Sequence, residues 1–260
     1  MGTWRMKLVV LLAVMSTIGI IAIIPYELTF MQGQPLPEGV PEGLSPTAVI
    51  AINSTVQALY IFVLILFGLR MQARTGLRVP LLEGIVYNVD RPQFSKRWFG
   101  ISVGVAALGS VLVIVLDLFL FHPLIDVPLG ESGPAPVWWQ GLLASFYGGI
   151  TEEVMLRLFG MTLIVWILAK VTKRRGAEVP ASFYYVAIVL TALLFGLGHL
   201  PATAQVFGEL SGVLVVRAIV LNGILGLWFG YLYWKRGLEY AIMAHFAADI
   251  VLHVIIAPLM

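Results

Sequence analysis

Two adjacent glutamates, Glu152 and Glu153, and a nearby arginine, Arg157, stand within an apolar stretch. Ionisable side chains inside a membrane span cost about 2.5–3.5 kcal/mol each, so they mark functional sites by default. On an α-helix Glu153 lies four residues before Arg157, so the two share a face and can pair. Glu152 is rotated by about 100° from Glu153 and lacks this partner. We predict that Glu152 is a free general base; the alternative is a charge cluster that only stabilises helix packing.

Two histidines and an aspartate lie on later apolar stretches. His245 and Asp249 are four residues apart and would face one cavity. His199 follows two glycines and precedes Pro201, which ends a helix soon after. We predict that His199, His245 and Asp249 bind zinc and leave one position for a water that a glutamate deprotonates. Each histidine alone could instead serve as an interhelical hydrogen-bond donor.

The composition requires a membrane around these residues. The 260-residue chain is 60% hydrophobic and 12% charged, with a mean hydropathy of +0.95, whereas a soluble domain is about 25% charged. A net charge of +2 argues against a nucleic-acid partner. The lack of cysteine excludes disulfides, thiolate ligands and a cysteine nucleophile. We predict an all-α polytopic membrane helix bundle with about seven spans, within a range of six to eight.

Seven apolar stretches can form these spans. They run roughly over Lys7–Pro25, Pro46–Leu69, Trp98–Phe121, Val137–Lys170, Ala181–Leu200, Gly212–Trp234 and Leu238–Ala257. The first has no small-residue cleavage site, so we expect a retained span rather than a signal peptide. We expect one integrated domain, in which residues 1–136 contribute three spans with an amphipathic cytoplasmic loop and residues 137–260 carry the chemistry.

The fourth stretch is too long for one ordinary crossing at about 1.5 Å per residue. We expect it to tilt, to project into the cytoplasm, or to break near Gly148 and Gly149. Asp117 and Arg217 lie near the ends of their stretches. We expect the Arg217 side chain to reach the membrane interface, and Asp117 to do the same or to cap a neighbouring helix.

The basic residues orient the chain. Of the 16 Lys and Arg residues, all but Arg157 and Arg217 precede the first span or lie in alternate loops. The positive-inside rule then predicts a cytoplasmic N-terminus and an external C-terminus, in the plasma membrane if the organism is prokaryotic. Counted from the span ends, His199 lies near the external side and His245 near the cytoplasmic side. A single site would therefore require shifted boundaries or re-entrant helix ends.

At these residues the chain resembles the CPBP family, the CAAX-protease and bacteriocin-processing membrane proteins, also called Abi. The family's three motifs read here as Glu152-Glu153-x-x-x-Arg157, Phe195-x-x-x-His199 and His245-x-x-x-Asp249. The resemblance covers roughly the second half of the chain. It implies an intramembrane endopeptidase that acts on a membrane-associated or prenylated protein or peptide. Leu156 and Leu158 depart from the aromatic residue and glycine common there, which leaves the substrate groove undefined.

The resemblance also implies roles for the site residues. Glu152 would activate the hydrolytic water with His199 beside it, and His245 and Asp249 would bind metal or stabilise the oxyanion. Glu153 and Arg157 would hold their helix in place. Asp249 stands where asparagine is commoner, and its negative charge favours a metal-ligand role. Two mechanisms stay open: a zinc peptidase, and a metal-free glutamate peptidase in which His245 donates to the oxyanion.

Other classes of function fit parts of the pattern. A non-catalytic immunity, scaffold or partner-stabilising membrane protein would use the same charges structurally, in contact with a membrane partner protein. A secondary transporter would use them as a proton relay, but the sequence has no visible inverted repeat. In every case membrane lipid is the expected environment.

Overall fold

The computed structural model describes residues 5–31, 43–88, 94–125 and 136–259. Within these ranges the chain is helical, and seven helical segments are long and apolar enough to cross a membrane. They run over Met6–Met31, Pro46–Gln72, Lys96–Leu124, Trp138–Val171, Ala181–Phe207, Gly212–Arg236 and Leu238–Ile256. The predicted polytopic helix bundle with seven spans is confirmed. Arg91, in the basic loop after the second span, lies outside the described residues.

Several spans combine more than one helix type. In chain order the helices are α1 (Met6–Ala22), α2 (Ile24–Met31), α3 (Pro46–Gln72), α4 (Pro80–Tyr87), α5 (Lys96–Leu116), the π-helix η1 (Asp117–Phe121), the 3-10 helix η2 (His122–Leu124), α6 (Trp138–Phe146), the π-helices η3 (Tyr147–Glu152) and η4 (Val154–Met161), α7 (Thr162–Val171), the 3-10 helix η5 (Gly176–Glu178), α8 (Ala181–Gly198), α9 (Leu200–Phe207), α10 (Gly212–Arg236), α11 (Leu238–Asp249), the π-helix η6 (Ile250–Ile256) and the 3-10 helix η7 (Ala257–Leu259).

Serine residues start three of the spans. The Ser45 hydroxyl accepts a hydrogen bond from the Ala48 amide at the start of α3, and Ser95 and Ser211 cap α5 and α10 in the same way. A serine at this position satisfies one of the amides that a helix leaves unpaired at its N-terminus. The N-termini of these three helices are therefore determined by residues that are close in the sequence.

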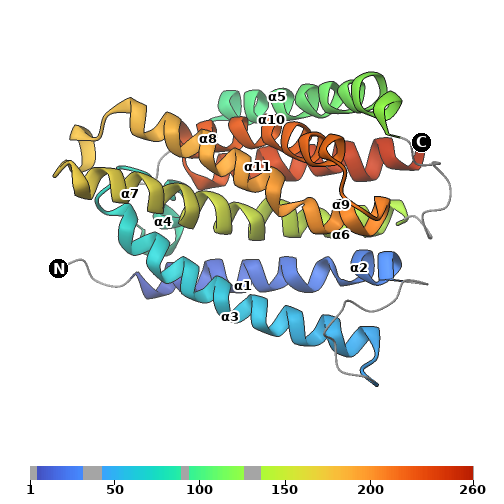
Figure 1. Cartoon of the computed structure of the whole chain (residues 1–260). Coiled ribbons are helices and arrows are strands. Elements are labelled where there is room, and N and C mark those ends of the chain that lie inside the picture. Colours follow the sequence, from blue (N-terminus) through green and yellow to red (C-terminus); the bar gives the residue numbers. More distant parts are fainter. Residues whose placement is uncertain (1–4, 32–42, 89–93, 126–135, 260) are drawn as a thin grey trace.

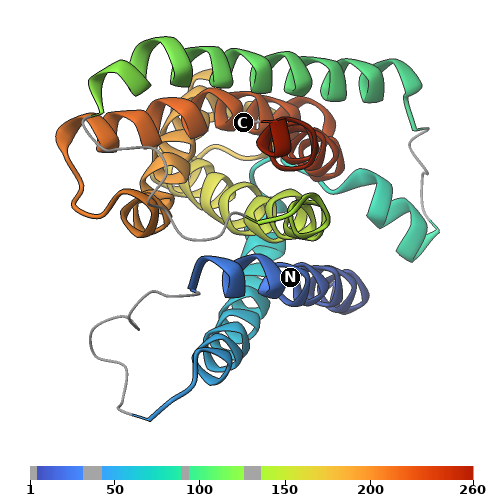
Figure 2. The ribbon, with the colours of Figure 1, turned by 90° about the vertical axis from the view of Figure 1, so that its right-hand side faces the viewer.

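The fourth span, α6 through α7, forms the centre of the bundle. It packs against α1 and α3 on one side and against α8 and α11 on the other. Figure 1 and the end-on view in Figure 2 show α10 beside α8 and α11, with α5 as the outermost helix of that side. The N-terminal spans thus cover one flank of the segment that carries the two glutamates.

Glycines allow the N-terminal helices to approach the fourth span closely. A Cβ atom on Gly19 of α1 would lie 2.6 Å from Thr151 Oγ1, and one on Gly68 of α3 would lie 2.7 Å from the Leu158 carbonyl oxygen. Thr151 also donates to the Ser16 carbonyl oxygen at 3.1 Å. Helices can come this close only where the side chain is absent.

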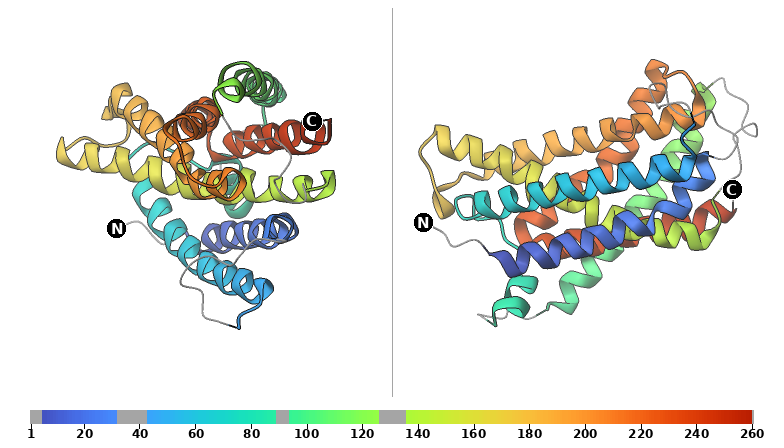
Figure 3. Two further views of the ribbon diagram at one scale, coloured as in Figure 1. Left: turned by 45° about the vertical axis from the view of Figure 1, so that its right-hand side comes forward. Right: turned by 90° about the horizontal axis from the view of Figure 1, so that it is seen from below.

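The fourth span continues without a break over its 34 residues. The predicted alternative of a break near Gly148 and Gly149 is wrong, because both glycines lie inside the π-helix η3. A π-helix closes i→i+5 hydrogen bonds and is commonly found at functional sites. The excess length projects instead, since α7 and α8 extend beyond the start of α11 in Figure 1 and in the right panel of Figure 3.

This projection removes the conflict of depth between the two histidines. His199 follows α8, but α9 continues the fifth span to Phe207, so His199 lies inside the span rather than at its end. Because α8 begins farther out than α11, counting residues from each span's start does not give a common depth. The fifth span therefore ends at Phe207 and not at Leu200 as predicted. A single site that includes both histidines needs no re-entrant helix.

Candidate active site

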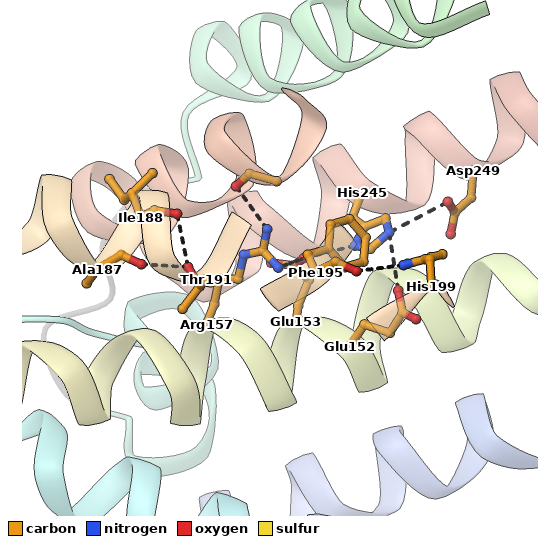
Figure 4. A network of polar contacts seen from close by, with 11 residues as sticks. Glu152, Glu153, Arg157, Ala187, Ile188, Thr191, Phe195, His199, His245 and Asp249 are labelled. Carbon is orange, nitrogen blue, oxygen red and sulfur yellow. Dashed lines mark hydrogen bonds and ion pairs between the residues drawn. The ribbon is translucent and has the colours of Figure 1, made fainter. Parts of the chain in front are cut away.

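Glu153 and Arg157 form the buried base of a polar cluster between the fourth, fifth, sixth and seventh spans (Figure 4). Both side chains are 0% exposed, and Glu153 Oε1 lies 3.3 Å from Arg157 Nη1. The predicted pair is therefore present. Arg157 Nη2 also donates to the Gly226 carbonyl oxygen at 2.9 Å. A Cβ on Gly226 would lie 3.3 Å from the same nitrogen, so glycine gives the guanidinium access to the α10 backbone.

Aromatic rings surround this guanidinium. Arg157 Cζ lies 5.3 Å from the Phe195 ring centroid and 5.6 Å from that of Phe229. Within the described chain, Arg157 Nε and Nη1 and Glu153 Oε2 have no hydrogen-bond partner. Buried polar atoms are normally satisfied, and exceptions call for a functional or structural explanation.

His245 connects the two glutamates. Its Nδ1 donates to Glu153 Oε1 at 2.8 Å, and its Nε2 lies 3.6 Å from Glu152 Oε2 and 3.6 Å from Asp249 Oδ1. The Phe229 ring stacks on the imidazole at 4.5 Å between centroids. The ring is thus fixed with Nε2 between two carboxylates.

The convergence of both glutamates on one histidine differs from the sequence prediction. An ordinary α-helical rotation would direct Glu152 away from the neighbours of Glu153. Glu152 instead ends the π-helix η3, and η4 begins directly after Glu153. The wider π-helical turn changes the angle between successive side chains, so both carboxylates reach His245.

Glu152 is the less constrained of the two acids. Its side chain is 18% exposed, and in the described part of the chain His245 is its ion-pair contact. It makes no hydrogen bond there, whereas Glu153 is fixed from two sides. As predicted, Glu152 does not pair with Arg157.

Gly148 of η3 packs directly against the Asp249 and His245 side chains. A Cβ atom there would lie 2.1 Å from Asp249 Oδ2 and 3.2 Å from His245 Nε2. The predicted common orientation of His245 and Asp249 is confirmed by their 3.6 Å contact. Only glycine leaves room for the aspartate against the π-helical backbone.

His199 enters the same region from the end of α8. Its Nδ1 donates to the Phe195 carbonyl oxygen at 2.8 Å, which leaves Nε2 as the free ring nitrogen. The Phe195 ring meets the edge of His199 at 4.8 Å and that of His245 at 5.4 Å. Figure 4 shows His199, Glu152 and His245 facing one another, so the three motifs meet in one place.

The predicted zinc ligands, His199, His245 and Asp249, all lie in this cluster and are chemically suitable. His199 and His245 each engage Nδ1 with a protein oxygen, an arrangement typical of metal-ligating histidines. Over the residues that the structure describes, however, no three His, Asp or Glu side chains are arranged to hold one metal ion.

Sequence reasoning missed a polar contact from the N-terminal half. Gln57 of α3 donates from Nε2 to the Tyr147 hydroxyl at 2.5 Å. Tyr147 lies five residues before Glu152 in η3, which is one π-helical turn. A glutamine in the middle of an apolar span was the available signal.

Comparison with known proteins agrees with this geometry. Residues 134–251 match the family model described as Rce1-like, type II CAAX prenyl endopeptidase. Over these residues the chain is similar to the CAAX-protease family. The match includes all three motifs and confirms the resemblance, while the first three spans lie outside it. No curated protein and no solved structure matched the chain.

Proposed function

We propose that this chain is an intramembrane endopeptidase that hydrolyses a peptide bond of a membrane-associated or prenylated protein, with Glu152 as the base that activates water. The observation that carries the proposal is the free Glu152 carboxylate. It is 18% exposed and lies 3.6 Å from His245 Nε2, while the adjacent Glu153 is fully buried. The family match over residues 134–251 supports the endopeptidase class.

Glu152 would accept a proton as water attacks the carbonyl carbon of the substrate. A C–O bond forms, the carbonyl electron pair moves onto oxygen, and a tetrahedral oxyanion results. Glu152 would then return the proton to the leaving nitrogen as the C–N bond breaks. General acid–base catalysis of this kind contributes about 10²–10⁴ in rate.

His199 and His245 would assist on either side of this base. His199 holds Nδ1 on the Phe195 carbonyl, so its free Nε2 can accept a hydrogen bond from the attacking water. His245 holds Nδ1 on Glu153, and a proton on its Nε2 would be donated to the oxyanion. Glu153 and Arg157 act as positioning residues, because they fix the imidazole and do not touch the reacting atoms.

Zinc bound by His199, His245 and Asp249 stays a prediction. If bound, it would polarise the carbonyl and lower the pKa of a bound water. Metal analysis of purified wild type and His245→Ala tests it: about one zinc per chain in the wild type and a loss in the variant would support the metal route. Active wild-type enzyme that contains no more zinc than His245→Ala, with zinc absent from both proteins, would refute the metal route and leave the glutamate route.

Glu152→Gln tests the catalytic proposal. Cells that carry this variant should accumulate uncleaved substrates, identified by proteomic comparison with wild type, and the purified variant should cleave them about 10²–10⁴-fold more slowly. Folded yield should remain unchanged, because Glu152 makes no hydrogen bond within the described chain. We expect the substrates among multi-pass or lipid-anchored proteins of the same membrane, the plasma membrane in a prokaryote.

Glu239→Gln is the matched control. Glu239 is a buried glutamate at the start of the seventh span, outside the three motifs, and its Oε1 accepts from the Leu82 amide at 2.8 Å. The amide of glutamine keeps an acceptor oxygen, so activity should be retained. A non-catalytic scaffold would give the opposite pattern: Glu152→Gln would lower protein abundance, and any phenotype would follow abundance.

A further inference from the structure

A cavity of about 240 Å³ lies at the projecting end of α7, and none of its lining residues belongs to the three motifs. The positive-inside rule assigns this end to the cytoplasm. Trp166 forms part of its wall, and its five basic lining residues are Arg74, Lys170, Lys173, Arg174 and Arg175. Five like charges around one concavity create a strongly positive potential that favours an anion.

Among the described residues, no acidic side chain neutralises these cations. Elsewhere Arg5 pairs with Glu83, and Arg217 pairs with Asp117. In the described ranges no carboxylate pairs with any of the five cavity cations, and Lys170 Nζ instead lies 4.8 Å from the Trp166 ring centroid. The charge is therefore available to a ligand.

The walls of the cavity are held together. The Gly176 amide donates to the Arg74 carbonyl oxygen at 3.0 Å, and the Tyr184 hydroxyl donates to the Thr75 carbonyl oxygen at 2.5 Å. The first contact joins the loop after α3 to the loop after α7, and the second joins the loop after α3 to the first turn of α8. The cations on the two loops are thus arranged before any ligand binds.

Lys173 occupies a backbone position that favours glycine. The Arg174 amide bonds to the Ala169 carbonyl at 2.8 Å, and the Lys173 amide bonds to the Lys170 carbonyl at 3.2 Å. This is a Schellman ending, with Lys173 at φ +57° in the left-handed region. A side chain is disfavoured there, so the presence of lysine indicates a use for its charge.

The surface next to the cavity suits acyl chains. Ile167 is 45% exposed and lies three residues before Lys170 on the same face of α7. Phe67 is 53% exposed and lies in the last two turns of α3, which ends two residues before Arg74. Tryptophan at such a level is typical of the membrane–water interface. Charge at the helix ends and apolar side chains one or two turns inward match a lipid with its headgroup in the cavity.

We propose that this cavity binds the phosphate-bearing headgroup of an anionic membrane lipid, whose acyl chains lie along Phe67 and Ile167. The proposal is independent of the peptidase function. It commits to lipid rather than to a soluble phosphate, because exposed apolar side chains adjoin the cations.

Native mass spectrometry of the full chain in detergent would test the proposal with phosphatidylglycerol, phosphatidylcholine and inorganic phosphate. The wild type should retain phosphatidylglycerol in preference to phosphatidylcholine. Lys170→Gln/Arg174→Gln should weaken phosphatidylglycerol binding on the order of tenfold or more, since each cation near an anionic lipid contributes several-fold. Lys96→Gln/Arg97→Gln removes the same charge from exposed positions outside the cavity and should change binding less than about twofold.

Lys173→Gly separates ligand binding from structure. Glycine suits the left-handed position, so the thermal midpoint of the purified variant should stay the same or rise, while phosphatidylglycerol binding should fall about fivefold. Equal weakening by the two double variants would indicate diffuse attraction and overturn the proposal. Inorganic phosphate that displaces phosphatidylglycerol at millimolar concentration would also overturn it, in favour of a soluble phosphorylated ligand.

Discussion

Arg157 and Arg217 each meet a carboxylate inside the spanning helices, but the two ion pairs have different geometry. Arg217 donates from Nε and Nη2 to the two oxygens of Asp117 at 2.6 and 2.5 Å. Arg157 lies 3.3 Å from one oxygen of Glu153, and that same oxygen accepts from His245. The side chains of Asp117 and Arg217 are 22% and 20% exposed, while those of Glu153 and Arg157 are 0% exposed.

The difference indicates what each pair is for. The bidentate Asp117–Arg217 contact uses both carboxylate oxygens and joins η1 to α10, as expected of an ion pair that stabilises helix packing. The Glu153–Arg157 pair divides its interactions among an imidazole, a backbone carbonyl and aromatic rings. Satisfied networks make a fold rigid, whereas unsatisfied buried atoms concentrate at functional sites.

Arg157→Met should have the largest effect on folding. It leaves the Glu153 charge buried without its partner, and such a loss destabilises by about 3–5 kcal/mol. The free energy of unfolding of the purified chain in mixed micelles would measure this. Arg157→Met/Glu153→Leu should recover part of the loss, because neither charge of the pair then remains, although His245 Nδ1 loses its acceptor. A double variant no more stable than the single one would contradict the ion-pair account.

Gly148→Ala should have a smaller effect, centred on the site. The added Cβ would lie 2.1 Å from Asp249 Oδ2, and overpacking of this kind costs about 1–3 kcal/mol. We expect activity to fall by about tenfold or more, measured on a cleaved substrate. Gly104→Ala is the control, since a Cβ there meets nothing within 4 Å; an equal loss of activity would show that general helix perturbation was responsible.

Arg217→Met should have the smallest effect. Its pair with Asp117 is partly exposed at the surface of the bundle and near the ends of two spans, so its loss should destabilise by about 1 kcal/mol. The thermal midpoint should fall slightly, and cleavage per folded molecule should remain that of wild type. A catalytic loss as large as that of Arg157→Met would erase the distinction between the two pairs.

Local features of the sequence determined the parts of this protein that depend on neighbours along the chain. The apolar stretches gave seven spans because each crossing needs about 20 apolar residues, whatever it packs against. The i,i+4 spacing of Glu153 and Arg157 gave their pairing because one helix brings them together. The three motifs showed the similarity to the CAAX-protease family without any knowledge of their positions in space.

Tertiary structure decided what depends on the register between helices. Asp117 and Arg217, expected to reach the interface separately, pair across 100 positions of the chain. The depth of His199 depends on how far α8 projects past α11. Both glutamates reach His245 because the fourth span adopts π-helical turns. A helical pattern in the sequence predicts which face of a helix carries a residue. It does not predict how far a neighbouring helix is shifted along its axis, or where a helix forms π-helical turns, so these contacts arise only when the spans pack.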